Sequence, residues 1–125
     1  VLLSFGLSAN ASLVGMWRAT KSSCLDTAEA IPLGIEWLTF QENGKARISR
    51  VNGNCKTNLE VPYSTKGNLI TFEAGVMGLS CNGVETDHET YQFVVSYNQP
   101  TSKSLTILSY TSTCHNVAVD YVLVE

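Results

Sequence analysis

The fold class is decided by residues 35–51, which read IEWLTFQENGKARISRV. Two runs rich in β-branched, aliphatic and aromatic residues, 35–40 and 46–51, flank the dipeptide Asn43-Gly44. Asn-Gly is the strongest short signal for a β-hairpin, because both central residues of the favoured turn take positive φ. The segment therefore predicts two antiparallel strands joined by a tight turn.

Similar short runs recur outward from this hairpin in both directions. We expect further strands, separated by glycine, asparagine and proline signals, at 14–21, 59–64, 69–74, 89–97, 105–111 and 117–124. No helical periodicity extends beyond about two turns, and this strand spacing is typical of an all-β sandwich or barrel. Eight strands joined in sequence predict an eight-stranded antiparallel up-and-down barrel, whose closure removes exposed edges. A long first loop at 22–34, with room for one helical turn at 25–30, and a loop around 75–88 complete the prediction.

Length and composition restrict the function classes. The chain has 125 residues, of which 44% are hydrophobic and 15% charged, and its net charge is −3. This length predicts a single barrel domain over 12–125. The low charge and the lack of a basic stripe exclude a surface built for nucleic acid, and no apolar run is long enough for a membrane span.

The N-terminal residues resemble the end of a secretory signal peptide. An apolar stretch, 2–7, precedes Ala9-Asn10-Ala11, which has the small-x-small form read by signal peptidase. We interpret 1–11 as a signal-peptide remnant. The alternative is an apolar segment that packs under the barrel.

The cysteines, like the signal-peptide resemblance, indicate an exported protein. Cys24, Cys55, Cys81 and Cys114 are dispersed and form no C-x-x-C pair, which disfavours zinc-ribbon and thioredoxin motifs. An even, dispersed set in a short chain is typical of two structural disulfides, the alternative being four buried thiols in a cytosolic protein. We therefore expect a periplasmic or extracellular protein.

The strand order also ranks the disulfide pairings. In a meander, alternate loops lie at the same end of the sheet, so all four cysteines fall on one rim. If the first strand pairs with the last, Cys24–Cys114 and Cys55–Cys81 are favoured. Cys24–Cys55 with Cys81–Cys114 stays open, because the long first loop could carry Cys24 toward the third strand.

Gly15-Met16-Trp17 resembles the G-x-W signature in the first strand of the lipocalins and the wider calycin group, which includes bacterial lipocalin-like domains. The resemblance implies that Trp17 packs across the closed base of an eight-stranded barrel and that Gly15 permits a close approach there. It also implies that the loop 22–34 partly covers the mouth.

The expected function is the non-catalytic binding of a small, mainly apolar molecule inside a secreted barrel. The residues proposed to line the site are aromatic: Trp37 or Phe40, Phe72, Tyr91, Phe93 and Tyr110. An eight-stranded barrel either fills itself with side chains or holds one small ligand, and both have such a lining. The alternative function is a protein-binding module, such as a periplasmic hydrolase inhibitor, that acts through the rim loops 22–34 and 75–88.

Catalytic and metal motifs are weak. The segment 78–82 lacks the last glycine of G-x-S-x-G, and Cys114 and His115, as strand neighbours, would face opposite sides. The densest set of metal-ligand types is 85–89, where three carboxylates share one strand face with His88 opposite. A solvated loop explains this cluster more simply, so we expect no enzyme activity, metal or cofactor.

Basic residues gather around the third predicted strand. Lys45 and Arg47 share one strand face, whereas Arg50 points to the other. A solvated sheet face is the simpler interpretation of the group. Arg50 could contact a ligand carboxylate if it points into the barrel.

Overall fold

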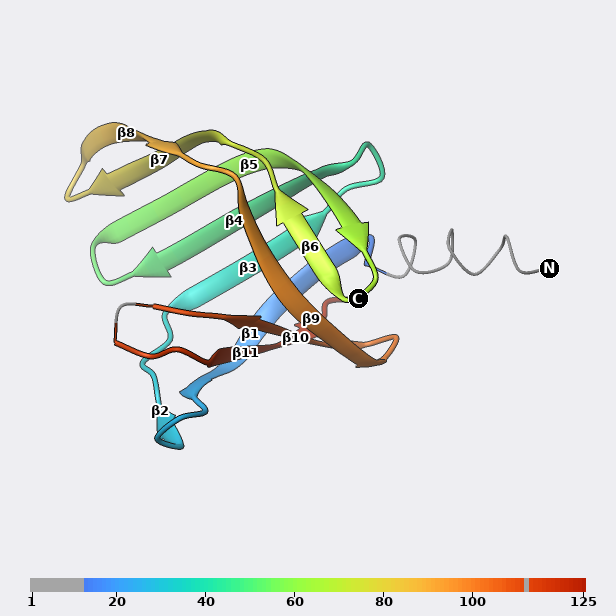
Figure 1. The fold of residues 1–125 in the computed structure, drawn as a ribbon. Coiled ribbons are helices and arrows are strands. Elements are labelled where there is room, and N and C mark those ends of the chain that lie inside the picture. The colour runs from blue at the N-terminus through green and yellow to red at the C-terminus, as the bar shows by residue number, and fades with distance from the viewer. Residues whose placement is uncertain (1–12, 112) are drawn as a thin grey trace.

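The computed structural model describes residues 13–111 and 113–125, and every regular element in this part of the chain is a β-strand (Figure 1). The strands are β1 (Gly15–Cys24), β2 (Glu29–Ala30), β3 (Ile35–Phe40), β4 (Lys45–Asn52), β5 (Cys55–Lys66), β6 (Leu69–Phe72), β7 (Gly75–Cys81), β8 (Val84–Thr90), β9 (Phe93–Thr101), β10 (Ser104–Ser109) and β11 (Val117–Leu123). None of the described residues belongs to a helix that could cross a membrane. The interpretation of 1–11 as a signal-peptide remnant concerns residues outside the described part.

Eight of these strands close into an antiparallel barrel, as predicted. The order around the ring is β1-β3-β4-β5-β6-β9-β10-β11, and β11 pairs with β1 to complete it. The hairpin predicted at Asn43-Gly44 joins β3 to β4, with Phe40 opposite Ala46 and Gly44 at a φ of 82°. The hairpin and the closed ring therefore agree with the sequence pattern, but at the turn only Gly44, and not Asn43, takes a positive φ.

The loop expected around 75–88 is instead a hairpin, β7–β8, outside the ring. On one edge, the twelve-residue strand β5 pairs with two strands in turn. Its segment 63–66 pairs with β6, and its segment 55–59 pairs with β7. Asn82 and Gly83 take φ values of 52° and 81°, which suit a tight hairpin turn. The strands were missed because β8 has no apolar alternation, and six of its seven residues are exposed.

The first loop also differs from the expected helical turn. Residues 25–28 form turns that lead into the short strand β2, which pairs with the end of β1. Asp26 accepts hydrogen bonds from the Nδ2 of Asn116 at 2.8 Å and the backbone N–H of His115 at 3.1 Å. These bonds, the one from Asn116 foremost, lower the pKa of Asp26 below its ordinary value.

The core fills the end of the barrel at which β1 begins. Trp17 is fully buried there, and its Nε1 donates a hydrogen bond to the carbonyl oxygen of Leu13 at 2.9 Å. Gly15 has a φ of 141°, and a Cβ at this position would lie 2.9 Å from Leu123 Cδ1. Trp17 and Gly15 therefore lie at the end of the barrel that the core fills, which we call the base.

Two disulfides lie at the opposite end, which we call the cysteine end. Cys24 is bonded to Cys114 and Cys55 to Cys81, the pairing favoured by strand adjacency. Cys55 and Cys81 are direct partners across β5 and β7, so the second bond fastens the hairpin to the barrel. These bonds indicate an oxidising environment for the folded chain.

Candidate functional site

Alternation along β3 decides which side chains face the barrel interior. Glu36, Leu38 and Phe40 are buried, with exposed fractions of 4%, 2% and 1%. Successive side chains of a strand point to opposite faces, so Trp37 lies on the outer face and is only half-buried. Of the pair Trp37 or Phe40, Phe40 is therefore the interior residue.

Three of the residues predicted to line the site meet in one aromatic stack. The ring centroids of Phe40 and Phe72 are 6.3 Å apart, and those of Phe72 and Phe93 are 4.9 Å apart. Phe40 and Phe72 are core residues, whereas Phe93 keeps 38% of its surface exposed. The stack therefore runs from the core to an accessible surface.

The other predicted lining residues lie away from this stack. Tyr91 is 84% exposed in the link before β9, and Tyr110 is 78% exposed just after β10. The alternation that groups Tyr91 with Phe93 is interrupted because β9 begins only at Phe93. Like Trp37 on the outer face, neither tyrosine is joined to the stack.

A cluster of polar side chains that sequence reasoning did not assemble lies on the inner face. Arg50 of β4 donates from Nε to Oε1 of Glu36 at 2.7 Å, and its Nη2 lies 2.7 Å from the same oxygen. The hydroxyl of Tyr121, from β11, donates to Oε2 of Glu36. We call Glu36, Arg50 and Tyr121 the inner polar cluster. Glu36 and Arg50 are register partners, whereas Tyr121 comes from β11, which is separated from β3 by β1.

Burial sets the electrostatics of this cluster. Tyr121 is 6% exposed, and burial together with the adjacent Glu36 carboxylate raises the pKa of its phenol far above the ordinary value. The phenol therefore stays protonated and acts as a hydrogen-bond donor. The side chain of Arg50 is 53% exposed although its carboxylate partner is buried.

Inward-facing residues become more exposed toward the cysteine end. Along β4, Ala46 is buried, Ile48 is half-buried and Arg50 is exposed. Along β5, Leu59 is buried and Thr57 is half-buried. Inward-facing side chains near the cysteine end of these two strands are therefore accessible to solvent, as Tyr63 and Thr65 are at the other end of β5.

The strand register places apolar surface beside the inner polar cluster. Arg50 is opposite Thr57, Thr57 is opposite Leu79, and Leu79 is half-buried. Two register positions toward the base, and so on the same face, the half-buried Met77 lies opposite Leu59. A charged group and adjoining apolar side chains are therefore accessible together on one surface.

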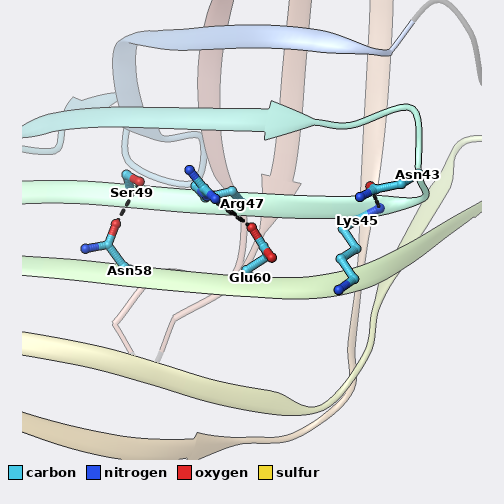
Figure 2. Close-up of polar contacts among 6 residues, drawn as sticks. All are labelled: Asn43, Lys45, Arg47, Ser49, Asn58 and Glu60. Atoms are coloured by element: carbon cyan, nitrogen blue, oxygen red, sulfur yellow. Dashed lines mark hydrogen bonds and ion pairs between the residues drawn. The ribbon is translucent and has the colours of Figure 1, made fainter.

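The outer face of β4 and β5 carries a different polar arrangement (Figure 2). Arg47 Nη2 lies 2.8 Å from Oε2 of Glu60, and the hydroxyl of Ser49 donates to Oδ1 of Asn58 at 2.9 Å. Hydrogen bonding to Arg47 is the main cause that lowers the pKa of Glu60. Lys45 and Arg47 thus share the outer face, and Arg50 faces inward, as alternation predicts.

The catalytic and metal candidates do not assemble. Within the described residues, the one group of three metal-ligand types is Cys24, Asp26 and Cys114. Both of its cysteines are in one disulfide, so neither offers a thiolate. The cluster at 85–89 lies on the exposed strand β8 and is not gathered into such a group.

Comparison with known proteins adds no relative, because no family model, curated protein or solved structure matches the chain. Function is therefore inferred from the geometry of the barrel and its inner polar cluster. One signal in the sequence could have revealed this cluster. Glu36 shares the parity of Leu38 and Phe40, so an inward-facing Leu38 and Phe40 require an inward-facing glutamate.

Proposed function

We propose that the chain is a secreted, lipocalin-like binding protein without catalytic activity. Its ligand is a small molecule with a mainly apolar body and a carboxylate, held at the cysteine end of the barrel. The observation that carries the proposal is a half-exposed arginine inside the barrel, held in place by a buried glutamate. The G-x-W residues at the base and the eight-stranded ring support the lipocalin-like assignment.

The ligand's carboxylate is inferred from the N–H donors of Arg50 that do not contact Glu36. A guanidinium group has five N–H donors in a planar fork that fits a carboxylate. Only Nε and Nη2 contact Glu36. The remaining donors belong to a side chain that is half exposed, so they are free to bind a second carboxylate from the solvent side. Glu36 fixes the fork and balances its charge when no ligand is bound.

The apolar body is argued from the surface beside Arg50. Leu79 and Met77 offer apolar contacts on the inner face. Burial of ~150–200 Å² of ligand surface at about 25 cal/mol per Å² gives roughly 4–5 kcal/mol before the costs of association. We therefore expect modest affinity, with the head group contributing a large share.

The compartment follows from the disulfides. Structural disulfides persist in the periplasm and outside cells and are rare in the cytosol. Both bonds lie at the cysteine end, where the proposed site opens. We therefore infer a periplasmic or extracellular carrier whose site is stabilised by covalent bonds.

The test is a titration with a fluorescent long-chain carboxylic acid and with its methyl ester. Because a charge-assisted hydrogen bond contributes about 1.5–3 kcal/mol, the acid should bind about tenfold tighter or more, with one-to-one stoichiometry. Arg50→Lys should reduce this preference by removing the fork. Arg47→Lys, on the outer face of the same strand, is the matched control and should leave it unchanged.

Two outcomes would contradict the proposal. One is that neither probe binds to the folded protein. The other is equal affinity for acid and ester, which would mean that Arg50 does not recognise the head group.

A further inference from the structure

The hairpin β7–β8 leaves one strand edge open. All seven residues of β8 pair with β7, from Gly75 opposite Thr90 to Cys81 opposite Val84. On its other side β7 pairs with β5, and no described strand pairs with the second edge of β8 (Figure 1). Every second residue of an edge strand directs its N–H and C=O outward. The edge therefore offers backbone hydrogen bonds to another chain.

The two faces of β8 differ in character. Glu85, Asp87 and Glu89 lie on the outer face, opposite Ser80, Gly78 and Val76 of β7. All three carboxylates are exposed, and no ion pair within the described part of the chain neutralises them. Alternate residues of a strand are about 6.6 Å apart, which makes a regular row of negative charge.

The inner face of β8 is uncharged at Val84 and Thr86 and continues onto apolar residues of β7. Thr86 lies opposite Leu79, and His88 lies opposite Met77. Val84 is 65% exposed. A strand added at this edge would therefore meet carboxylates on one face and Val84, Thr86 and His88 on the other.

A second copy of this chain is a poor partner for the edge. Antiparallel pairing of two β8 strands about Asp87 places Asp87 opposite Asp87 and Glu85 opposite Glu89. Like charges directly opposite one another destabilise a strand pair, and opposite charges stabilise it. The charge pattern therefore selects a basic partner and disfavours self-association.

We propose that the free edge of β8 binds an extended basic segment of a partner protein by strand addition. The segment has Lys or Arg at alternate positions, facing Glu85, Asp87 and Glu89, and apolar or small residues between them. Backbone bonds along the edge supply affinity, and the alternating side chains supply specificity. The edge of β8 is a different element from the inner polar cluster, and its inner face adjoins Leu79 and Met77, which the proposed ligand also contacts.

The probe is a seven-residue peptide with lysine and valine in alternation, titrated into the full chain by calorimetry. The same peptide with glutamate for lysine tests charge, and an N-methylated version, which lacks half of the backbone donors, tests strand addition. We expect binding by the lysine peptide alone, and loss of amide hydrogen exchange confined to β8 and its neighbours. Binding by all three peptides, or by none, would overturn the proposal.

Charge-matched variants locate the site. Glu85→Gln with Asp87→Asn should weaken peptide binding about three- to tenfold, the range expected for two cross-strand charge pairs. Glu29→Gln with Glu42→Gln removes the same charge from exposed positions elsewhere and should change affinity far less. Equal losses in the two variants would mean only general attraction to an acidic protein. A dimer paired through β8 in solution would likewise contradict the proposal.

Discussion

Two arginines of β4 each pair with a glutamate on a neighbouring strand, one pair on the inner face of the barrel and the other on the outer face. Arg50 lies 2.7 Å from Glu36 on the inner face, and Arg47 lies 2.8 Å from Glu60 on the outer face. The arginines are equally exposed, at 53% and 55%, but the carboxylate partner is 5% exposed inside and 39% exposed outside. The difference therefore lies in the solvation of the carboxylate.

That difference distinguishes a surface ion pair from the inner pair, on which the proposed ligand site depends. A surface ion pair is screened by water and contributes little to stability. A buried carboxylate requires its partners, because its charge becomes costly once they are removed. The inner pair, with Tyr121 as a further donor to Glu36, fixes an arginine at an accessible position inside the barrel. The outer pair has no comparable constraint.

The largest expected effect is on stability after removal of each arginine. Arg50→Ala leaves Glu36 buried without a counter-charge and should lower the free energy of unfolding by about 2–3 kcal/mol, after allowance for the exposed half of Arg50. Arg47→Ala should change it by an amount near experimental error. Urea denaturation with both disulfides intact measures the two variants. Equal losses of stability would contradict the claim that the inner pair contributes more than the outer pair.

The next largest effect on stability is expected from Tyr121, which donates a hydrogen bond to Glu36 of the inner pair. Tyr121→Phe removes the donor to Glu36 Oε2 and leaves that oxygen buried, so it should lower the free energy of unfolding by about 1.5–2 kcal/mol. Tyr110→Phe, at a 78% exposed position, is the matched control. If the two substitutions cost the same, the hydroxyl of Tyr121 does not stabilise the cluster.

Alkaline pH should reveal the same interaction. The folded-state pKa of Tyr121 is raised above its ordinary value of 10.0, so its contribution is fully present below pH 10.0 and is lost as pH rises above it. The expected slope is roughly 1.4 kcal/mol of stability per pH unit between the unfolded and folded pKa values. Denaturation midpoints along this range should fall less steeply in Tyr121→Phe. Parallel curves for variant and wild type would contradict the assignment.

The smallest effect is that of salt on the outer pair. At about 1 M salt the Debye length is about 3 Å, so the attraction between Arg47 and Glu60 is screened while the buried pair is not. Binding of Arg47 lowers the pKa of Glu60, so the contribution of this carboxylate is present above its unfolded pKa and is lost as pH falls through the folded one. NMR titration of the Glu60 carboxyl at low and high salt should show the pKa rise toward its ordinary value. A pKa insensitive to salt would argue against a simple surface pair.

The barrel was predictable because local signals agree with its closure. Asn43-Gly44 identifies one hairpin, and loop parity places the four cysteines on one rim. Adjacency of the first and last strands then favours the disulfide pairing that the structure has. The hairpin β7–β8 was not predictable by the same reasoning. Gly75 and Gly78 interrupt its first strand, and its second strand lacks a buried face to impose alternation.

The site was only partly predictable. Phe40 and Phe72 follow from parity, because alternation places them inside once the strands are known. The contact between Tyr121 and Glu36 joins residues 85 positions apart, which no local pattern encodes. Tyr91 and Tyr110 lie beyond strand ends, where alternation no longer determines direction.

The most direct test of the central claim is native mass spectrometry of the protein purified from the cells that make it. We expect a bound small molecule at one-to-one stoichiometry, released on unfolding and identified as a carboxylic acid with an apolar body. The molecule should be lost from Arg50→Lys and retained by Arg47→Lys. A bare chain mass for the wild type, or a molecule retained equally by both variants, would contradict the claim that the inner pair builds a ligand site.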